Sequence, residues 1–136
     1  MKRTVIGCIV GLVTWVIVVS LIDRGLRALL AGYAAAEPAL AFTLQMMAAR
    51  LGMAAVTSLI AGAAIGAVAP TSKLAPSILG VVLLCLFIPM HVKVWHAFPV
   101  WYHLTFLLTL APLILLGAHL SSRKGLSGNA VRALTS

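Results

Sequence analysis

The side chains that can do chemistry in this chain are few, and most of them flank two turns between long apolar segments. The 136 residues contain two acids, Asp23 and Glu37, and four histidines. Arg50 lies at the edge of an apolar segment. A guanidinium keeps its proton, so an arginine in apolar surroundings needs an acidic partner or a bound anion. We therefore predict either an ion pair of Arg50 with Asp23 or Glu37, or an anion site for a carboxylate or a lipid phosphate.

Further polar and aromatic residues belong to the same candidate ligand-binding cluster. Its members are Arg50, Asp23, Arg27, Glu37, His91, His96, Trp101 and His103. Trp101 has Trp95 and Tyr102 close to it in the sequence. Aromatic residues at a membrane boundary are typical of an aromatic belt, and this simpler interpretation of Trp101 stays open.

Three of the histidines, His91, His96 and His103, raise the question of a metal or haem site. Two imidazoles from facing helices can ligate a b-type haem, and three can hold a metal ion. The spacings of five and seven residues, however, match no helical i, i+4 pair, and no cysteine or acid adjoins them. We predict no cofactor and no metal ligands, with His91 and His103 as the only candidates if haem or metal is bound.

These residues must be positioned by four apolar runs, none of which contains a charged residue. The runs are Thr4–Ile22, Leu51–Ala69, Leu74–Met90 and Val100–Leu120. Hydrophobic residues make up 62% of the chain and charged residues 9%. A helix needs roughly 20 apolar residues to cross a bilayer. We predict an all-α membrane protein, a four-transmembrane-helix bundle over residues 1–122 with spans at about 4–22, 44–69, 74–94 and 100–120, followed by a short polar tail over 123–136. Cleavage of the first run as a signal peptide is the alternative, which its length disfavours.

The basic residues predict the orientation of the chain. Six of them would lie on one side of the membrane: Lys2, Arg3, Lys73, Arg123, Lys124 and Arg132. Four would lie on the other: Arg24, Arg27, Arg50 and Lys93. The positive-inside rule then places both termini in the cytoplasm and the candidate cluster on the outer side of a cell membrane, taken to be a bacterial inner membrane. The charges form no dense basic patch, so we expect the lipid bilayer as partner and no nucleic acid.

The connection from Asp23 to Arg50 is the longest between the predicted spans. Leu26, Leu29, Leu30 and Tyr33 follow the spacing of an amphipathic helix, so we predict an amphipathic segment at the outer surface. Glu37 and Pro38 together are typical of a helix start. If the second spanning helix begins near Pro38, Arg50 lies about three turns inside it.

Small residues at helical spacing indicate close packing. Gly7 and Gly11 lie one turn apart in the first run, and Ser58, Gly62 and Gly66 continue a ridge in the second. Small side chains let helix backbones approach closely in lipid. The pattern predicts packing of the first two spanning helices within the chain, and a homodimer seam or a larger membrane complex is the alternative.

The function classes follow from what these segments contain. None of the four apolar runs carries a carboxylate, and the chain contains no P-loop and no HExxH motif. We expect a non-catalytic accessory or structural subunit that acts through helix packing. The alternatives are a binding or transport module for an anionic or lipid ligand at the outer Arg/His/aromatic cluster, and a haem- or metal-binding electron-transfer subunit.

Overall fold

All regular secondary structure in the described part of the chain is helical, which confirms the all-α prediction. The computed structural model describes the backbone of residues 1–134 and the side chains of residues 1–123. Within that range the helices are α1 (Lys2–Leu29), α2 (Tyr33–Ala36), α3 (Leu44–Val68), α4 (Leu74–Lys93) and α5 (Val100–Leu134). Helix α5 continues through most of the predicted polar tail, of which residues 135–136 lie outside the described residues.

Four helices, α1, α3, α4 and the Val100–Arg123 part of α5, are long and apolar enough to cross a membrane by length and composition. Their outer faces carry exposed large apolar side chains, for example Ile17 on α1, Leu86 on α4 and Leu108 on α5. A helix at the surface of a water-soluble domain instead places polar residues on its outer face. The exposed apolar faces are typical of helices that cross a membrane.

The start of α3 differs from the one predicted near Pro38. Residues 37–43 form turns and extended chain, and α3 begins at Leu44. The hydroxyl of Thr43 accepts a hydrogen bond from the backbone nitrogen of Met46 at 3.3 Å, which caps the first turn. Leu40 interrupts the backbone with a φ of 53°, in the left-handed region. The start signal at Pro38 is thus overridden by the cap at Thr43, five residues later.

The amphipathic segment is also arranged differently from the prediction of a separate helix. Leu26 and Leu29 belong to the last turns of α1, which runs without a break through Asp23. Gly32 then takes a φ of 78°, which reverses the chain and starts the single turn of α2 at Tyr33. The predicted apolar stripe is therefore divided between the end of α1 and α2.

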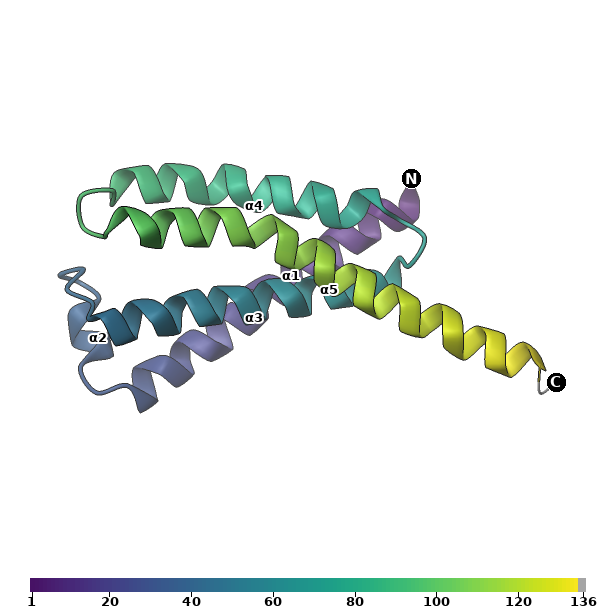
Figure 1. The fold of residues 1–136 in the computed structure, drawn as a ribbon, viewed down its shortest axis with the longest axis horizontal. Helices are drawn as coiled ribbons and strands as arrows, with labels where there is room; N and C mark the ends of the chain where they lie inside the picture. The colour runs from purple at the N-terminus through teal and green to yellow at the C-terminus, as the bar shows by residue number, and fades with distance from the viewer. Residues whose placement is uncertain (135–136) are drawn as a thin grey trace.

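The helices alternate in direction along the longest axis of the molecule (Figure 1). Helix α4 and the first half of α5 form an antiparallel pair, and α1 lies against α3. The N-terminus and the turn between α3 and α4 lie at one end, which we call the termini end. Helix α2 and the turn between α4 and α5 lie at the other, which we call the α2 end. The N-terminus and the end of α5 at Leu134 are thus on the same side of the helix assembly, because the number of long helices within the described residues is even.

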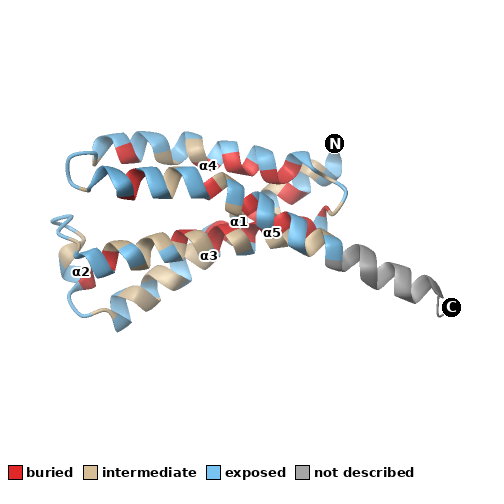
Figure 2. Cartoon of the chain, viewed as in Figure 1, coloured by how far each residue is buried: buried red, intermediate tan, exposed pale blue. Residues whose placement is uncertain are grey.

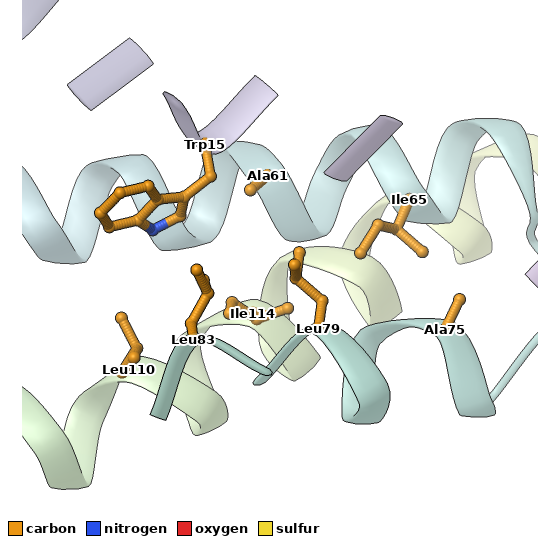
Figure 3. Packing of buried hydrophobic residues seen from close by; sticks show 8 residues of the cluster. All are labelled: Trp15, Ala61, Ile65, Ala75, Leu79, Leu83, Leu110 and Ile114. Carbon is orange, nitrogen blue, oxygen red and sulfur yellow. The ribbon is translucent and has the colours of Figure 1, made fainter. Parts of the chain in front are cut away.

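The apolar core lies where the four long helices meet. Its side chains come from all of them: Trp15 from α1, Ala61 and Ile65 from α3, Ala75, Leu79 and Leu83 from α4, and Leu110 and Ile114 from α5 (Figure 3). Buried residues follow the inward faces of the helices, while the outward faces are exposed (Figure 2). The core therefore positions the helix ends that carry the candidate site.

The ridge of small residues on α3 packs against α5, and the prediction that it packs against the first helix is wrong for this ridge. A Cβ atom at Gly62 would overlap the backbone carbonyl of Ile114, and one at Gly66 would overlap that of Ala118. Gly117 on α5 meets the carbonyl of Leu59 in the same way. We call this contact the α3–α5 crossing. Since it is covered within the chain, the ridge is not free to form a homodimer seam.

Glycines of α1 contact α3 and α4, as the small-residue pattern predicts for packing within the chain. A Cβ atom at Gly11 would press on the side chains of Ile65 and Leu79, and one at Gly7 on those of Ala69 and Ala75. Ser58 on α3 is fully buried and lies one helical turn before Gly62, on the same ridge. Helix α5 changes direction partway along its length (Figure 1), and Pro112 within it supplies the physical cause, because proline removes a backbone donor.

Candidate functional site

Arg50 lies at the α2 end, in the second turn of α3, where aromatic residues surround its guanidinium. Nη1 of Arg50 donates a hydrogen bond to the hydroxyl of Tyr33 at 2.9 Å. Nε of Arg50 donates a longer one, 3.4 Å, to the hydroxyl of Tyr102. The guanidinium carbon also lies 4.8 Å from the centre of the Phe42 ring, within the range of a cation–π interaction. The positive charge of Arg50 is therefore stabilised by two phenol hydroxyls and by an aromatic ring.

Both acids of the chain are bound by Arg27. Its Nε lies 2.7 Å from a carboxylate oxygen of Asp23, and its Nη2 lies 2.8 Å from one of Glu37. Asp23 and Arg27 are one helical turn apart on α1, and the reversal at Gly32 brings Glu37 back to the same place. No ion pair joins Arg50 to either acid among the described residues, so the predicted Arg50 ion pair is wrong.

Tyr33 connects Arg50 to the acids without a direct ion pair. Its hydroxyl accepts from Arg50 and lies 3.5 Å from a carboxylate oxygen of Asp23, toward which it donates. The Tyr33 side chain is fully buried at the base of this network. Burial raises the pKa of the Tyr33 hydroxyl, and the positive charge of Arg50 opposes that rise. The phenol therefore stays neutral at physiological pH and separates the cation from the acids.

A pocket of about 210 Å³ opens beside Arg50, between α3, α4, α5 and the segment before α3. Its walls are largely aromatic: Phe42, Phe87, Phe98, Tyr102 and Phe106. The charged and polar side chains that reach it are Arg50, Glu37 and His91. Since Glu37 is already paired with Arg27, the guanidinium of Arg50 is the charged group that lines the pocket without an acidic partner among the described residues.

His91 and His103 form a buried pair at one wall of the pocket. Their Nδ1 atoms are 2.8 Å apart, close enough for a hydrogen bond between the two rings. His103 is fully buried, and Trp95 stacks on its ring with centroids 4.7 Å apart. Nε2 of His103 has no hydrogen-bond partner among the described residues. The Nδ1 atoms of His91 and His103 are thus directed at each other.

The histidine geometry differs from what a haem or metal site needs. Axial haem ligands lie on opposite sides of the iron, with their nitrogens about 4 Å apart. The two Nδ1 atoms here are closer and bond to each other. His96 is exposed in the turn after α4. Within residues 1–123 no three histidine, cysteine, aspartate or glutamate side chains come close enough to hold a metal ion.

The predicted cluster is therefore divided by the structure. Arg50 and His91 line the pocket, and His103 forms a hydrogen bond with His91 without lining the pocket itself. Trp101 and His96 are exposed and do not line it. Sequence reasoning missed the roles of Tyr33 and Tyr102. From the sequence, Tyr33 is predicted to belong to an apolar stripe and Tyr102 to an aromatic belt. No signal in the sequence pairs either hydroxyl with Arg50.

The arrangement suits the binding of an anion. Four arginine and lysine residues and two acids lie at the α2 end, so this end carries an excess of two positive charges. A guanidinium forms paired hydrogen bonds with carboxylate or phosphate oxygens, and these bonds are strong in apolar surroundings.

Comparison with known protein families, curated proteins and solved structures finds no match to the chain.

Proposed function

We propose that this chain is a multi-pass protein of a cell membrane, taken to be a bacterial inner membrane. In this proposal it is a four-helix bundle with both termini in the cytoplasm and the α2 end on the outer side. The four long apolar helices and their exposed apolar faces support the membrane location. The larger number of basic residues at the termini end supports the orientation.

The orientation is tested with two reporter fusions. A fluorescent protein that folds only in the cytoplasm is expected to be bright when fused after Ser136. Alkaline phosphatase, which is active only outside the cytoplasm, is expected to be active when inserted after His96, in the turn between α4 and α5. The reverse pattern would place the α2 end in the cytoplasm and overturn the orientation.

Within this membrane protein, the pocket at the α2 end binds the anionic group of an amphiphile, a carboxylate or a lipid phosphate. One observation carries this proposal: the guanidinium of Arg50 lines an aromatic pocket, while Arg27 holds both acids of the chain. A purely structural role explains the glycines of the α3–α5 crossing. It does not explain why a cation is kept beside a pocket with no carboxylate bound to it.

The proposal is tested by binding measurements on the full chain in phosphatidylcholine nanodiscs. Dodecyl phosphate and laurate serve as anionic probes, dodecyltrimethylammonium as the cationic control, and empty nanodiscs correct for partitioning. Tryptophan fluorescence reports binding, because Trp95 and Trp101 lie at the same end of the molecule. We expect saturable binding of at least one anionic probe and none of the cation.

Two substitutions make the test specific to Arg50. Arg50→Gln removes the charge and is expected to weaken binding of the anionic probe by about 10- to 100-fold, the equivalent of one or two charge-assisted hydrogen bonds. Arg24→Gln is the matched control, because Arg24 is an exposed arginine at the same end. Equal binding by wild type and Arg50→Gln would overturn the proposal, and so would equal losses in the two variants.

A further inference from the structure

The hydrogen bond between His91 and His103 determines where each ring carries its proton. A hydrogen bond between two Nδ1 atoms needs one hydrogen, so one ring donates from Nδ1 and the other accepts there. In a neutral pair the accepting ring then carries its own proton on Nε2. Two arrangements are possible, and they differ in which ring has the Nε2 hydrogen.

The surroundings of His103 select between them. Its Nε2 is buried and has no partner among the described residues. If His103 accepted at Nδ1, its Nε2 would bear a hydrogen without a nitrogen or oxygen acceptor among the described residues. Buried N–H groups without an acceptor are rarer in proteins than buried acceptors without a donor. The stacked Trp95 ring lies nearly parallel to the imidazole, at 13°, so it faces the ring and not its Nε2 edge. His103 is therefore the donor, with its proton on Nδ1.

His91 then accepts at Nδ1 and carries its hydrogen on Nε2. Its Nδ1 is directed at His103, so Nε2 is the nitrogen left for other partners. His91 lines the pocket together with Arg50. We infer that His103 is a positioning residue that holds His91 with its Nε2–H as a second donor in the pocket, beside the guanidinium of Arg50. This inference deepens the proposed anion site and rests on it for its consequence.

The consequence is a narrower ligand class. With Arg50 and His91 both donating, the pocket favours a group with at least two acceptor oxygens, such as a phosphomonoester or a carboxylate. It disfavours an ammonium group, which brings only donors and a positive charge. The shared chemistry is an anionic oxygen pair, and dodecyl phosphate and laurate distinguish the phosphate source from the carboxylate source.

The proton positions are tested directly, without any ligand. The full chain is labelled with ¹⁵N-histidine in nanodiscs, in a His96→Asn, His119→Asn background that removes the two exposed histidines. Long-range ¹H–¹⁵N spectra distinguish a ring protonated on Nδ1 from one protonated on Nε2. We expect one ring of each kind at neutral pH, with the Nδ1–H ring assigned to His103 and the Nε2–H ring to His91. Two Nε2–H rings, or assignment of the Nδ1–H ring to His91, would overturn the inference.

The binding consequence is tested with two variants of His103. Asn places an amide nitrogen near the position of Nδ1 and keeps a donor, whereas Leu removes it. We expect His103→Leu to bind the anionic probe about fivefold more weakly and His103→Asn to bind it nearly as wild type does. Equal losses in both variants, or none in either, would overturn the positioning role. Absence of probe binding by wild type would instead overturn the proposed function, while the spectra still decide the proton positions.

Discussion

The α3–α5 crossing and the α2 end both involve α3 and α5, but small side chains lie at the crossing and large side chains at the α2 end. At the crossing, Gly62, Gly66 and Gly117 let the backbones of α3 and α5 touch. At the α2 end, Phe42 and Tyr102 stand among α3, α4 and α5 and leave a pocket of about 210 Å³. Glycine permits the close approach on which helix association in lipid depends. Large rings hold helices apart, so the backbones touch in one region and a pocket remains in the other.

Polar groups are treated differently in the two regions as well. Near the crossing, the hydroxyls of Thr57 and Ser58 are buried without a partner among the described residues. At the α2 end, Arg50, Tyr33 and Asp23 form a continuous network. The crossing tolerates isolated hydroxyls because they are small and uncharged. A guanidinium costs far more to bury, so it occurs only where several partners surround it.

The largest effect is expected from a bulky residue at the crossing. Gly62→Leu places a side chain where the carbonyl of Ile114 lies and is expected to abolish stable folding, because the backbones must separate. Leu83→Ala leaves a cavity in the core without forcing helices apart, and is expected to cost less, about 2–4 kcal/mol. Thermal unfolding in mild detergent measures both.

Gly52→Leu is the matched control for the crossing, since it lies on the same helix with nothing within 4 Å of an added Cβ atom. We expect its unfolding temperature to stay close to that of wild type. A similar loss of stability in Gly52→Leu and Gly62→Leu would mean that the close contact with α5 does not determine stability.

The next effect concerns the partners of Arg50. Tyr33→Phe removes the 2.9 Å hydrogen bond from the guanidinium and is expected to destabilise the chain by about 1.5–3 kcal/mol, the range for bonds to charged groups. Tyr102→Phe removes only the 3.4 Å contact and is expected to cost less. Chemical unfolding of the three proteins gives the order, and a larger loss in Tyr102→Phe would contradict this description of the network.

A smaller effect tests whether the acids act on Arg50 directly. Because Glu37 pairs with Arg27, the effects of Arg50→Ala and Glu37→Gln on the free energy of unfolding are expected to add within about 0.5 kcal/mol. A double-mutant cycle measures the difference. A coupling well above that value would show a direct ion pair and remove the main support for an anion site.

The smallest effect is on pH dependence and concerns Tyr33. Its pKa is raised above the ordinary 10.0, first of all by burial, so the folded chain holds the phenolic proton more tightly than the unfolded chain. The stability from this difference is fully present below about pH 10 and is lost as the pH rises through the raised pKa. Unfolding of wild type from about pH 9 to about pH 11.5 is expected to show a loss that Tyr33→Phe lacks. Parallel curves for the two proteins would contradict it.

Much of the helical framework is predictable from the sequence because it depends on local properties. Long apolar runs bounded by charged or proline-containing turns determine four long helices, and their even number brings the start of α1 and the end of α5 to one end. The glycines at 7, 11, 62 and 66 lie at close helix contacts, where a larger side chain would press on the neighbouring helix. These features need only spacing and residue size.

Contacts between distant segments were decided by the tertiary structure alone. The partner of the α3 ridge is α5, because the crossing depends on where four helices pack together and not on the ridge itself. The acids pair with Arg27, and Arg50 donates hydrogen bonds to Tyr33 and Tyr102 instead. The chain reversal at Gly32 causes this, because it brings Glu37 close to Arg27. The helical periods in the sequence define the face on which each residue lies. They do not define which face of another helix that residue will contact. The pocket beside Arg50 depends on these contacts between helices.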